Sequence, residues 1–337
     1  MTSQDCIRCR YALQSVSAAK TLHPVKLQLA KLDEGYGEGM RHAFLIMAHN
    51  NWEQLRILLT LLDDSRNDIF LHIDKKAIDS PSRDDLESLL KHATLHFTPR
   101  MDVTWGGDSQ ISCEMLLLKQ AIPSQCDYYH LLSGVDLPLH SMDYIDSFFI
   151  AHRGQEFLSL AEVADSISQT TRERISLYHP LQNLLGRRFF RITNGCNTLQ
   201  RMLHIDRLRS HQNLVLGKGA NWFSITGDFA KHVVENWHQW ASVFSSSFCG
   251  DEVFLQTMIL NSPFAERIYH YNAKTRSGHG SYMRLIDWKR GSPYVFRTTD
   301  YKELSTSPML FARKFDERVD PEIINKVADH VRSEQSK

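Results

Sequence analysis

The chain has 337 residues, of which 42% are hydrophobic and 23% charged, ordinary values for a globular protein that buries a substantial core. Its 39 basic residues balance 39 acidic ones, so no net positive field attracts nucleic acid and we expect no nucleic-acid partner. No apolar run approaches the ~18–20 residues of a membrane span, and the N-terminus lacks the apolar core of a signal peptide.

The first 39 residues have little hydrophobic periodicity and end in a glycine-rich stretch just before Met40. We therefore expect residues 1–39 to be a flexible leader or an over-extended start. Residues 43–48 form the first predicted strand, and leucines at 55, 58, 59 and 62 have the spacing of an amphipathic helix. A second strand over 68–73 completes a β-α-β unit.

The same alternation continues along the chain. We predict strands over 94–97, 128–132 and 220–226, and helices over 84–92, 109–121, 144–151, 229–240, 253–260 and 321–332. Asp108 or Ser109 is expected to cap the helix over 109–121, and residues 333–337 to form a short tail. Alternating strands and helices favour an α/β fold in which helices flank a mostly parallel sheet.

A section rich in arginine, residues 162–213, breaks this rhythm. Its arginines are Arg172, Arg174, Arg187, Arg188, Arg191, Arg201, Arg207 and Arg209. One interpretation is a solvated helical face. The other is a lid or an acceptor-side helical insertion, which would suit an anionic acceptor glycan. Both interpretations remain open at this point.

Residues 130–139 form the most informative stretch of the chain. An apolar run stops at Ser133-Gly134, continues to Asp136 and is then broken by Pro138. This pattern predicts a buried strand that delivers a carboxylate into the loop at its end. Because open α/β sheets bind ligands at the carboxyl ends of their strands, Asp136 is a candidate functional residue.

Four segments together resemble a known family. They are 72–76 (HIDKK), 105–109 (WGGDS), 130–139 (HLLSGVDLPL) and 310–316 (LFARKFD), and in this order they resemble the core 2/I-branching N-acetylglucosaminyltransferases and peptide xylosyltransferases. The resemblance runs from about residue 41 to about residue 331. It implies a GT-A-like, single catalytic domain over 40–332, a UDP-sugar donor and a glycan acceptor.

No two aspartates in the chain are separated by one residue, so the Asp-x-Asp pair that holds a metal in common nucleotide-sugar transferases is missing. Lys or Arg can neutralise a leaving diphosphate instead. The resemblance likewise implies a metal-independent enzyme, and we expect no metal and no cofactor beyond the UDP-sugar co-substrate. Cys6 and Cys9 have redox or zinc spacing, but no second pair completes a site.

Several residues are candidates for the donor side. Asp74 follows a strand and suits a ribose or uracil contact, although it could simply cap a turn. His49 and Asn50 follow the first strand and would face the nucleoside; an N-cap role for Asn50 or Asn51 is the alternative. We expect the floor of the donor pocket to be built by Trp105, Gly106, Ser133 and Asp136.

Two cations are candidates for the diphosphate. Lys314 lies between aromatic residues in FARKF, where a charge needs a partner. The family resemblance implies that this lysine contacts the diphosphate of UDP, and Arg297 best matches a second, assisting cation. A surface salt bridge is the alternative for either residue.

Inverting transfer needs a base that deprotonates the acceptor hydroxyl. The resemblance places Glu252 at the family's catalytic glutamate. The xylosyltransferases instead use an aspartate just before Trp-Phe, and this chain has Asn221 there, which cannot act as a base. Trp288 matches a tryptophan that stacks on the acceptor sugar, although a core role is equally compatible, and we expect Arg174 to contact the acceptor as well.

We therefore predict an inverting, metal-independent glycosyltransferase that moves a sugar from UDP-N-acetylglucosamine in β linkage, with UDP-xylose as the alternative donor. A bacterial cytoplasmic enzyme of surface-polysaccharide synthesis fits best, with peripheral contact to the inner membrane left open. Two rivals belong to other classes. One is a non-catalytic carbohydrate-binding module, and the other a glycoside hydrolase with Asp136 and Glu252 about 5–9 Å apart.

Overall fold

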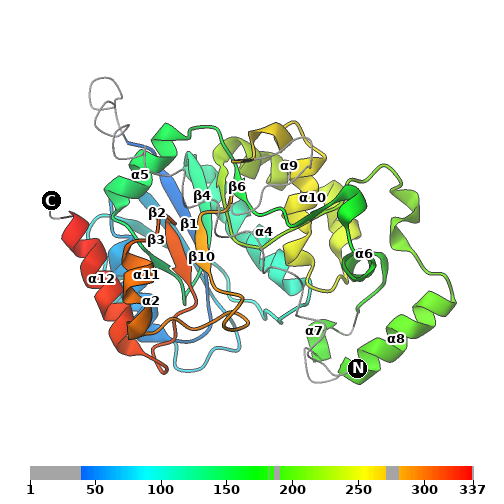
Figure 1. Cartoon of the computed structure of the whole chain (residues 1–337), viewed down its shortest axis with the longest axis horizontal. Coiled ribbons are helices and arrows are strands. Elements are labelled where there is room, and N and C mark those ends of the chain that lie inside the picture. Colours follow the sequence, from blue (N-terminus) through cyan, green and yellow to red (C-terminus); the bar gives the residue numbers. More distant parts are fainter. Residues whose placement is uncertain (1–38, 181, 186–189, 271–280, 336–337) are drawn as a thin grey trace.

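The computed structural model describes residues 39–180, 182–185, 190–270 and 281–335 (Figure 1). Residues 1–38 of the expected leader, with Cys6 and Cys9, lie outside this part, as do Arg187 and Arg188. The first described residues pack against the rest of the fold. Met40 is buried, and its backbone N–H donates to Asp146 Oδ1 at 2.9 Å.

A six-stranded sheet forms the centre, in the order β3-β2-β1-β4-β9-β6. Its strands are β1 (His42–Ala48), β2 (Asn67–Ile73), β3 (Thr94–Phe97), β4 (Tyr128–Ser133), β6 (Phe157–Leu158) and β9 (Phe223–Thr226). The first four are mutually parallel, which confirms the prediction of a mostly parallel sheet. Strand β9 runs antiparallel to β4, so its beginning lies beside the carboxyl end of β4.

Strand β1 has hydrophobic side chains on both faces because the sheet is covered on both sides. Phe44 and Ile46 belong to one hydrophobic cluster, with residues of α2 (Trp52–Leu61), α5 (Met142–Ala151) and α12 (Pro321–Gln335). Ala43 and Leu45 belong to another, with α4 (Ser109–Ala121), α9 (Gly227–Phe244) and α10 (Phe254–Leu260). Successive strand residues point to opposite faces, so a continuous apolar run serves both layers.

The remaining elements are short. A second sheet pairs β10 (Arg284–Ile286) in parallel with β11 (Phe311–Arg313), which pairs antiparallel with β5 (Leu137–Pro138). Strands β7 (Glu162–Val163) and β8 (Gly217–Lys218) frame the arginine-rich section. The other helices are α3 (Arg83–Glu87), α6 (Gln169–Ser176), α7 (Gln182–Leu185), α8 (Phe190–Met202) and α11 (Tyr301–Ser305).

Four predicted boundaries are wrong by three residues or more, and the first is the end of α9, which lies at Phe244 rather than 240. Helix α3 ends at Glu87 rather than 92, because the backbone N–H groups of residues 91–93 donate to the carboxylate of Asp63. Strand β9 begins at Phe223 rather than 220, since Ala220 accepts a hydrogen bond from Gln256. Helix α12 continues to Gln335, so most of the expected tail is helical.

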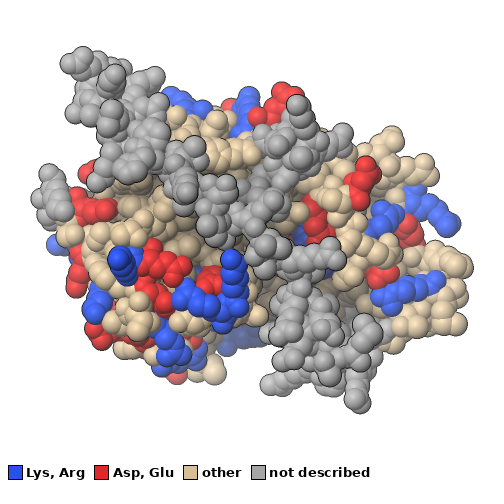
Figure 2. All heavy atoms as spheres, viewed as in Figure 1, with Lys and Arg blue, Asp and Glu red and all other residues tan. Residues whose placement is uncertain are grey.

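Acidic and basic side chains are interspersed on the face shown in Figure 2, as the balanced composition predicts. The arginine-rich section forms the helices α6, α7 and α8 at one end of the molecule (Figure 1). Within the described ranges, no helix has both the length and the apolar character that crossing a membrane requires.

Candidate active site

The candidate residues converge on one edge of the central sheet. His49 follows β1, Asp74 follows β2, and Ser133 ends β4. Because β9 is antiparallel, Asn221 just before it lies at the same edge. This is the carboxyl edge of the parallel strands, where ligands of α/β folds bind.

On the donor side of this edge, the end of β1 lies near the FARKF segment, which is close to the C-terminal end of the described chain. The charges of Asp74, Lys314 and Arg313 all act on the imidazole of His49, so the FARKF segment lies beside the end of β1. Partial desolvation lowers the pKa of His49, although the residue keeps an exposed surface. Asp74 raises that pKa, and the two cations lower it further. The backbone N–H of Asp74 donates to the carbonyl of Ala48 at 2.9 Å, next to His49, and the charge of Lys314 reaches the same imidazole.

The carboxylate of Asp74 organises the loop after β2. Its Oδ1 accepts from the backbone N–H of Lys76 at 2.8 Å, and its Oδ2 accepts from that of Val103 at 3.2 Å. The turn-capping role that the sequence left open is thus present. Asn50 lies partly buried between β1 and α2, and the following residue, Asn51, is the N-cap in a left-handed conformation without a side-chain cap. The N-cap alternative left open for Asn50 or Asn51 therefore holds for the position of Asn51, without a side-chain hydrogen bond.

Asp136 points into the protein rather than into solvent. It is 2% exposed, its Oδ1 accepts from Ser133 Oγ at 2.7 Å, and its Oδ2 accepts from Ser133 N–H at 2.9 Å. The guanidinium of Arg313 lies 3.6 Å from Oδ1 and 3.9 Å above the ring of Trp222. Asp136 therefore orders the turn after β4 and provides a counter-charge for a buried arginine.

Arg297 and Trp288 lie in the segments around Lys314. Phe296 N–H donates to the carbonyl of Lys314 at 2.9 Å, which places the exposed Arg297 next to this backbone. Trp288 follows β10, whose residue Ile286 pairs with Arg313, and is 39% exposed. Both residues thus belong to the FARKF side of the site.

Glu252 and Arg174 form the acidic side of the site. Arg174 of α6 donates to Glu252 Oε2 at 2.7 Å. The side chain of Arg174 is 16% exposed and that of Glu252 36%, so the carboxylate is held by a buried arginine yet still meets solvent. The backbone carbonyl of Glu252 accepts from Gly219 N–H at 2.9 Å, close to Asn221. A short charge-assisted bond of this kind orients a carboxylate firmly.

Two further carboxyl groups lie behind Glu252. Burial, together with the negative charge of Glu252, raises the pKa of Asp251 to about 7, and Arg174 opposes this shift. Burial, together with Asp251, raises the pKa of Glu114 well above its usual range, and the nearby amide of Asn221 opposes the shift. Gln110 Nε2 donates to Asp251 Oδ2 at 2.9 Å. Only Glu252 of these three acids reaches solvent, so it is the one available to a substrate.

The WGG loop attaches the insertion to this site. Gly106 has φ +74°, and a Cβ there would lie 2.9 Å from the ring of Phe248. A Cβ on Gly107 would lie 2.0 Å from Asn183 Oδ1, an atom that accepts from Ser109 N–H at 3.3 Å. The absence of a Cβ at Gly106 and Gly107 thus lets protein side chains pack closely against this loop. Trp105 is 48% exposed and meets Phe248 edge to face.

Asp108 is the N-cap residue of α4, but its side chain does not cap the helix. Its carboxylate instead accepts from Asn183 Nδ2 and from the backbone N–H of Ser246. The predicted capping interaction is therefore replaced by bonds that hold α7 and the segment before η5 (Gly250–Glu252) together. The Asp108 carboxylate, which local sequence rules would place on the N–H groups of the helix end, is thus engaged by tertiary hydrogen bonds instead.

Three arginines of the insertion have specific partners within it. Arg172 pairs with Asp206 at 2.8 Å, Arg201 with Glu173 at 2.6 Å, and the guanidinium of Arg207 lies 4.6 Å from the ring of Tyr178. These contacts hold the insertion together, and Arg174 connects it to Glu252. The arrangement favours an insertion beside the site over a merely solvated face.

The sequence matches the family described as "Core-2/I-Branching enzyme" over residues 42–309. The chain belongs to this family. The matched residues contain the central sheet and the described site residues other than Arg313 of β11 and Lys314, which follow the matched range. The expected family membership is thus confirmed, and the α/β sheet flanked by helices is the expected GT-A-like fold.

Curated relatives of the family are xylosyltransferases. Xylosyltransferase 2 of Rattus norvegicus and of Homo sapiens are each 23% identical over 315 residues, and a xylosyltransferase of Ciona intestinalis is 22% identical over 308 residues. The first two matches cover 88% of this chain. The chain spans about a third of the length of these relatives, since 34% or 33% of each is covered.

The sequence interpretation missed the residues that support the site. Arg313, Trp222, Gln110 and Glu114 all lie within it, but none stands in a pattern that separates it from an ordinary core residue. A buried Glu among the apolar positions of α4 was the one available indication, because an acid there needs a partner.

Proposed function

We propose that the chain is an inverting glycosyltransferase that moves a sugar from a UDP-sugar to a hydroxyl of a glycan acceptor. The observation that carries this proposal is the position of Glu252, a carboxylate open to solvent and held by Arg174, at the sheet edge that also carries His49, Asp74 and Lys314. Family membership supports it.

In the proposed reaction, Glu252 takes the proton of the acceptor hydroxyl. The acceptor oxygen then attacks the anomeric carbon, the bond from that carbon to the diphosphate oxygen breaks, and the configuration inverts. UDP leaves with the bonding electron pair, and Lys314 offsets the charge that develops on it. Arg174 keeps the carboxylate of Glu252 oriented while the proton moves.

UDP-xylose is the better supported donor, because the similar curated proteins are xylosyltransferases. UDP-N-acetylglucosamine, the donor first expected from the sequence, is the second candidate. The amide of Asn221 favours it, since the xylosyltransferase resemblance requires a carboxylate at that position. With Asn221, either donor needs Glu252 as the base.

Asp136 does not suit the rival glycoside hydrolase mechanism. A hydrolase needs two carboxyl groups that both face the sugar. Asp136 is buried, and both of its oxygens accept hydrogen bonds from Ser133. A carbohydrate-binding module would need no base in the site, whereas Glu252 is exposed there.

A panel of UDP-sugars tests the proposal, with release of UDP as the measurement. We expect turnover of UDP-xylose or UDP-N-acetylglucosamine that persists in EDTA, because Lys314 can offset the diphosphate charge without a metal. Loss of turnover in EDTA that manganese restores would contradict the metal-independent mechanism. Release of sugar without any nucleotide dependence would favour a hydrolase.

A further inference from the structure

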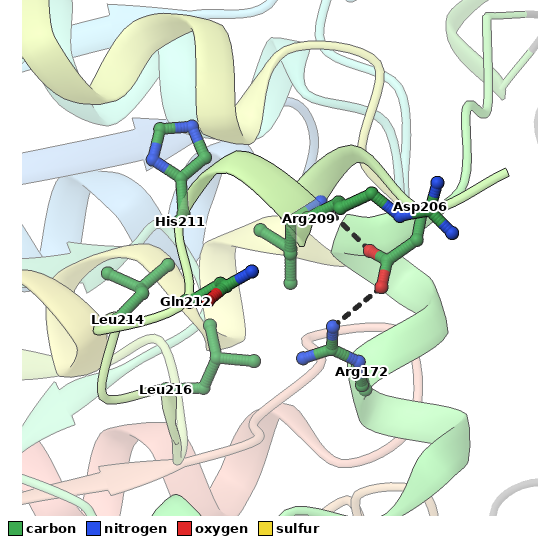
Figure 3. Close-up of a pocket in the computed structure, with 8 residues that line it drawn as sticks. Arg172, Asp206, Arg209, His211, Gln212, Leu214 and Leu216 are labelled. Carbon is green, nitrogen blue, oxygen red and sulfur yellow. Dashed lines mark hydrogen bonds and ion pairs between the residues drawn. The ribbon is translucent and has the colours of Figure 1, made fainter.

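A hollow lies on the insertion, away from Glu252. It is a cavity of about 340 Å³ between Arg172 of α6 and the segment 206–216 (Figure 3). This volume is at the lower end of the about 300–1,000 Å³ of ligand pockets and suits a single small ring. Arg172 and Arg174 are two residues apart on α6, which is about 200° around a helix, so the cavity and Glu252 lie on opposite sides of α6.

One wall of the cavity is a fixed polar pair. Arg172 Nη2 donates to Asp206 Oδ2 at 2.8 Å, and Asp206 Oδ1 accepts from Leu208 N–H at 2.9 Å. The side chains of Arg172 and Asp206 are 39% and 34% exposed, so both keep polar atoms within reach of a ligand. The ion pair therefore holds its donor and acceptor atoms in place before a ligand binds.

The opposite wall combines an amide with apolar groups. Figure 3 shows Gln212, Leu214 and Leu216 facing Arg172 and Asp206 across the hollow. Leu208 and Leu216 are buried, whereas Gln212 is exposed. A sugar ring has hydroxyl groups at its edge and C–H groups on its faces, which matches polar groups around apolar walls.

The charge of the cavity is positive once its internal pair is counted. Arg172 offsets Asp206, while Arg209 on the rim is exposed and forms no ion pair within the described parts of the chain. The imidazole of His211 lines the cavity beside it. A guanidinium recognises a carboxylate through two parallel N–H bonds, so this rim favours a ligand with a carboxylate.

We propose that this cavity binds a sugar unit that carries a carboxylate, a hexuronic acid. The occupant is a distal unit of the acceptor glycan, because α6 separates the cavity from Glu252 and the chain of the glycan must pass around it. This assignment of the occupant rests on the proposed transferase function, whereas the binding of a uronic acid does not.

Binding of methyl glucuronide to the whole chain tests the proposal, measured by ligand-observed NMR beside methyl glucoside and inorganic phosphate. We expect the glucuronide to bind and the neutral glucoside to bind at least about tenfold more weakly, because the carboxylate contact is lost. Arg209→Ala should weaken glucuronide binding by at least about tenfold. Gln212→Ala, which changes an exposed side chain outside the core, should weaken it as well.

Arg153→Ala is the matched control, since Arg153 is exposed at the end of α5 on the other part of the molecule. Equal binding of glucoside and glucuronide, displacement of the glucuronide by equimolar phosphate, or equal loss with Arg153→Ala would overturn the proposal. Glucuronide binding without UDP-sugar turnover would refute the proposed function alone. Turnover without glucuronide binding would refute the cavity assignment alone.

Discussion

Two single-residue variants should distinguish the loss of the base from the loss of the diphosphate contact. Glu252→Gln keeps the shape of the side chain but cannot take a proton. We expect transfer to fall by ~10²–10⁴-fold, the usual contribution of a general base, while UDP binding stays nearly unchanged. Glu266→Gln is the control, because Glu266 is exposed outside the site. Near-wild-type turnover of Glu252→Gln would move the role of base to another acid, first of all Asp251.

Lys314→Ala should act first on the nucleotide. Lys314 lies beside His49 and Asp74, and its removal takes away a charge-assisted contact to the diphosphate. We expect weaker UDP binding by calorimetry, by about tenfold or more. Lys302→Ala, an exposed lysine on α11, serves as the control. Unchanged UDP affinity of Lys314→Ala would place the diphosphate elsewhere.

At the scale of elements, the WGG loop holds the insertion against the site. Gly107→Ala would place a Cβ 2.0 Å from Asn183 Oδ1 and displace the side chain that bonds to Ser109 and Asp108. We expect a loss of about 1–3 kcal/mol in the free energy of unfolding, the usual range for overpacking. Urea unfolding measures it.

Gly195→Ala in α8 is the matched control for this substitution. Nothing lies within 4 Å of a Cβ at Gly195, so the change should be neutral or stabilise the helix by up to about 1 kcal/mol. If both glycine variants unfold at the same urea concentration, the contact between α7 and the WGG loop contributes little to the fold.

At the scale of the whole molecule, a chain of buried side chains links α5, β1, β4 and β9. His42 Nε2 lies 3.2 Å from Asp146, His42 Nδ1 lies 3.0 Å from His130 Nε2, and His130 Nδ1 lies 2.8 Å from Ser224 Oγ. Burial lowers the pKa of His130 well below its usual 6.5, and the neighbouring His42 lowers it further. His130 is therefore neutral in the folded protein at pH 7.

The sign of the pH dependence follows from this shift. Below about pH 6.5 the unfolded chain binds a proton at His130 that the folded protein does not, so stability falls as pH falls, by at most about 1.4 kcal/mol per pH unit. In His130→Gln this contribution is absent, and the loss between pH 6.5 and 5 should be smaller than in the wild type. Urea unfolding at several pH values measures the difference.

Other groups affect the absolute pH dependence but not this difference. Burial raises the pKa of Glu156 from 4.5 to about 7, so its contribution falls as pH rises through that interval. Glu156 is present in both proteins, and its effect therefore cancels. Identical pH slopes for the two proteins would show that His130 is protonated in the folded state or stays neutral in both states.

The sequence alone predicted the five longer strands of the central sheet, the four family segments and their order. A continuous apolar run such as β1 indicates a strand buried on both faces, and Glu252 could be singled out from a local Asp-Glu pair before an apolar helix. These conclusions depend on neighbours within a few residues, which the sequence displays directly.

Only the tertiary structure decided what surrounds those residues. Arg174 and Glu252 are 78 residues apart in the chain, and the partners Asp136 and Arg313 are farther apart still. No periodicity or spacing predicts such pairs, because they arise where the turn after β4, β11 and the insertion meet at the sheet edge. For the same reason Asp136 became the counter-charge of the mostly buried Arg313, while the Glu252 side chain stayed open to solvent.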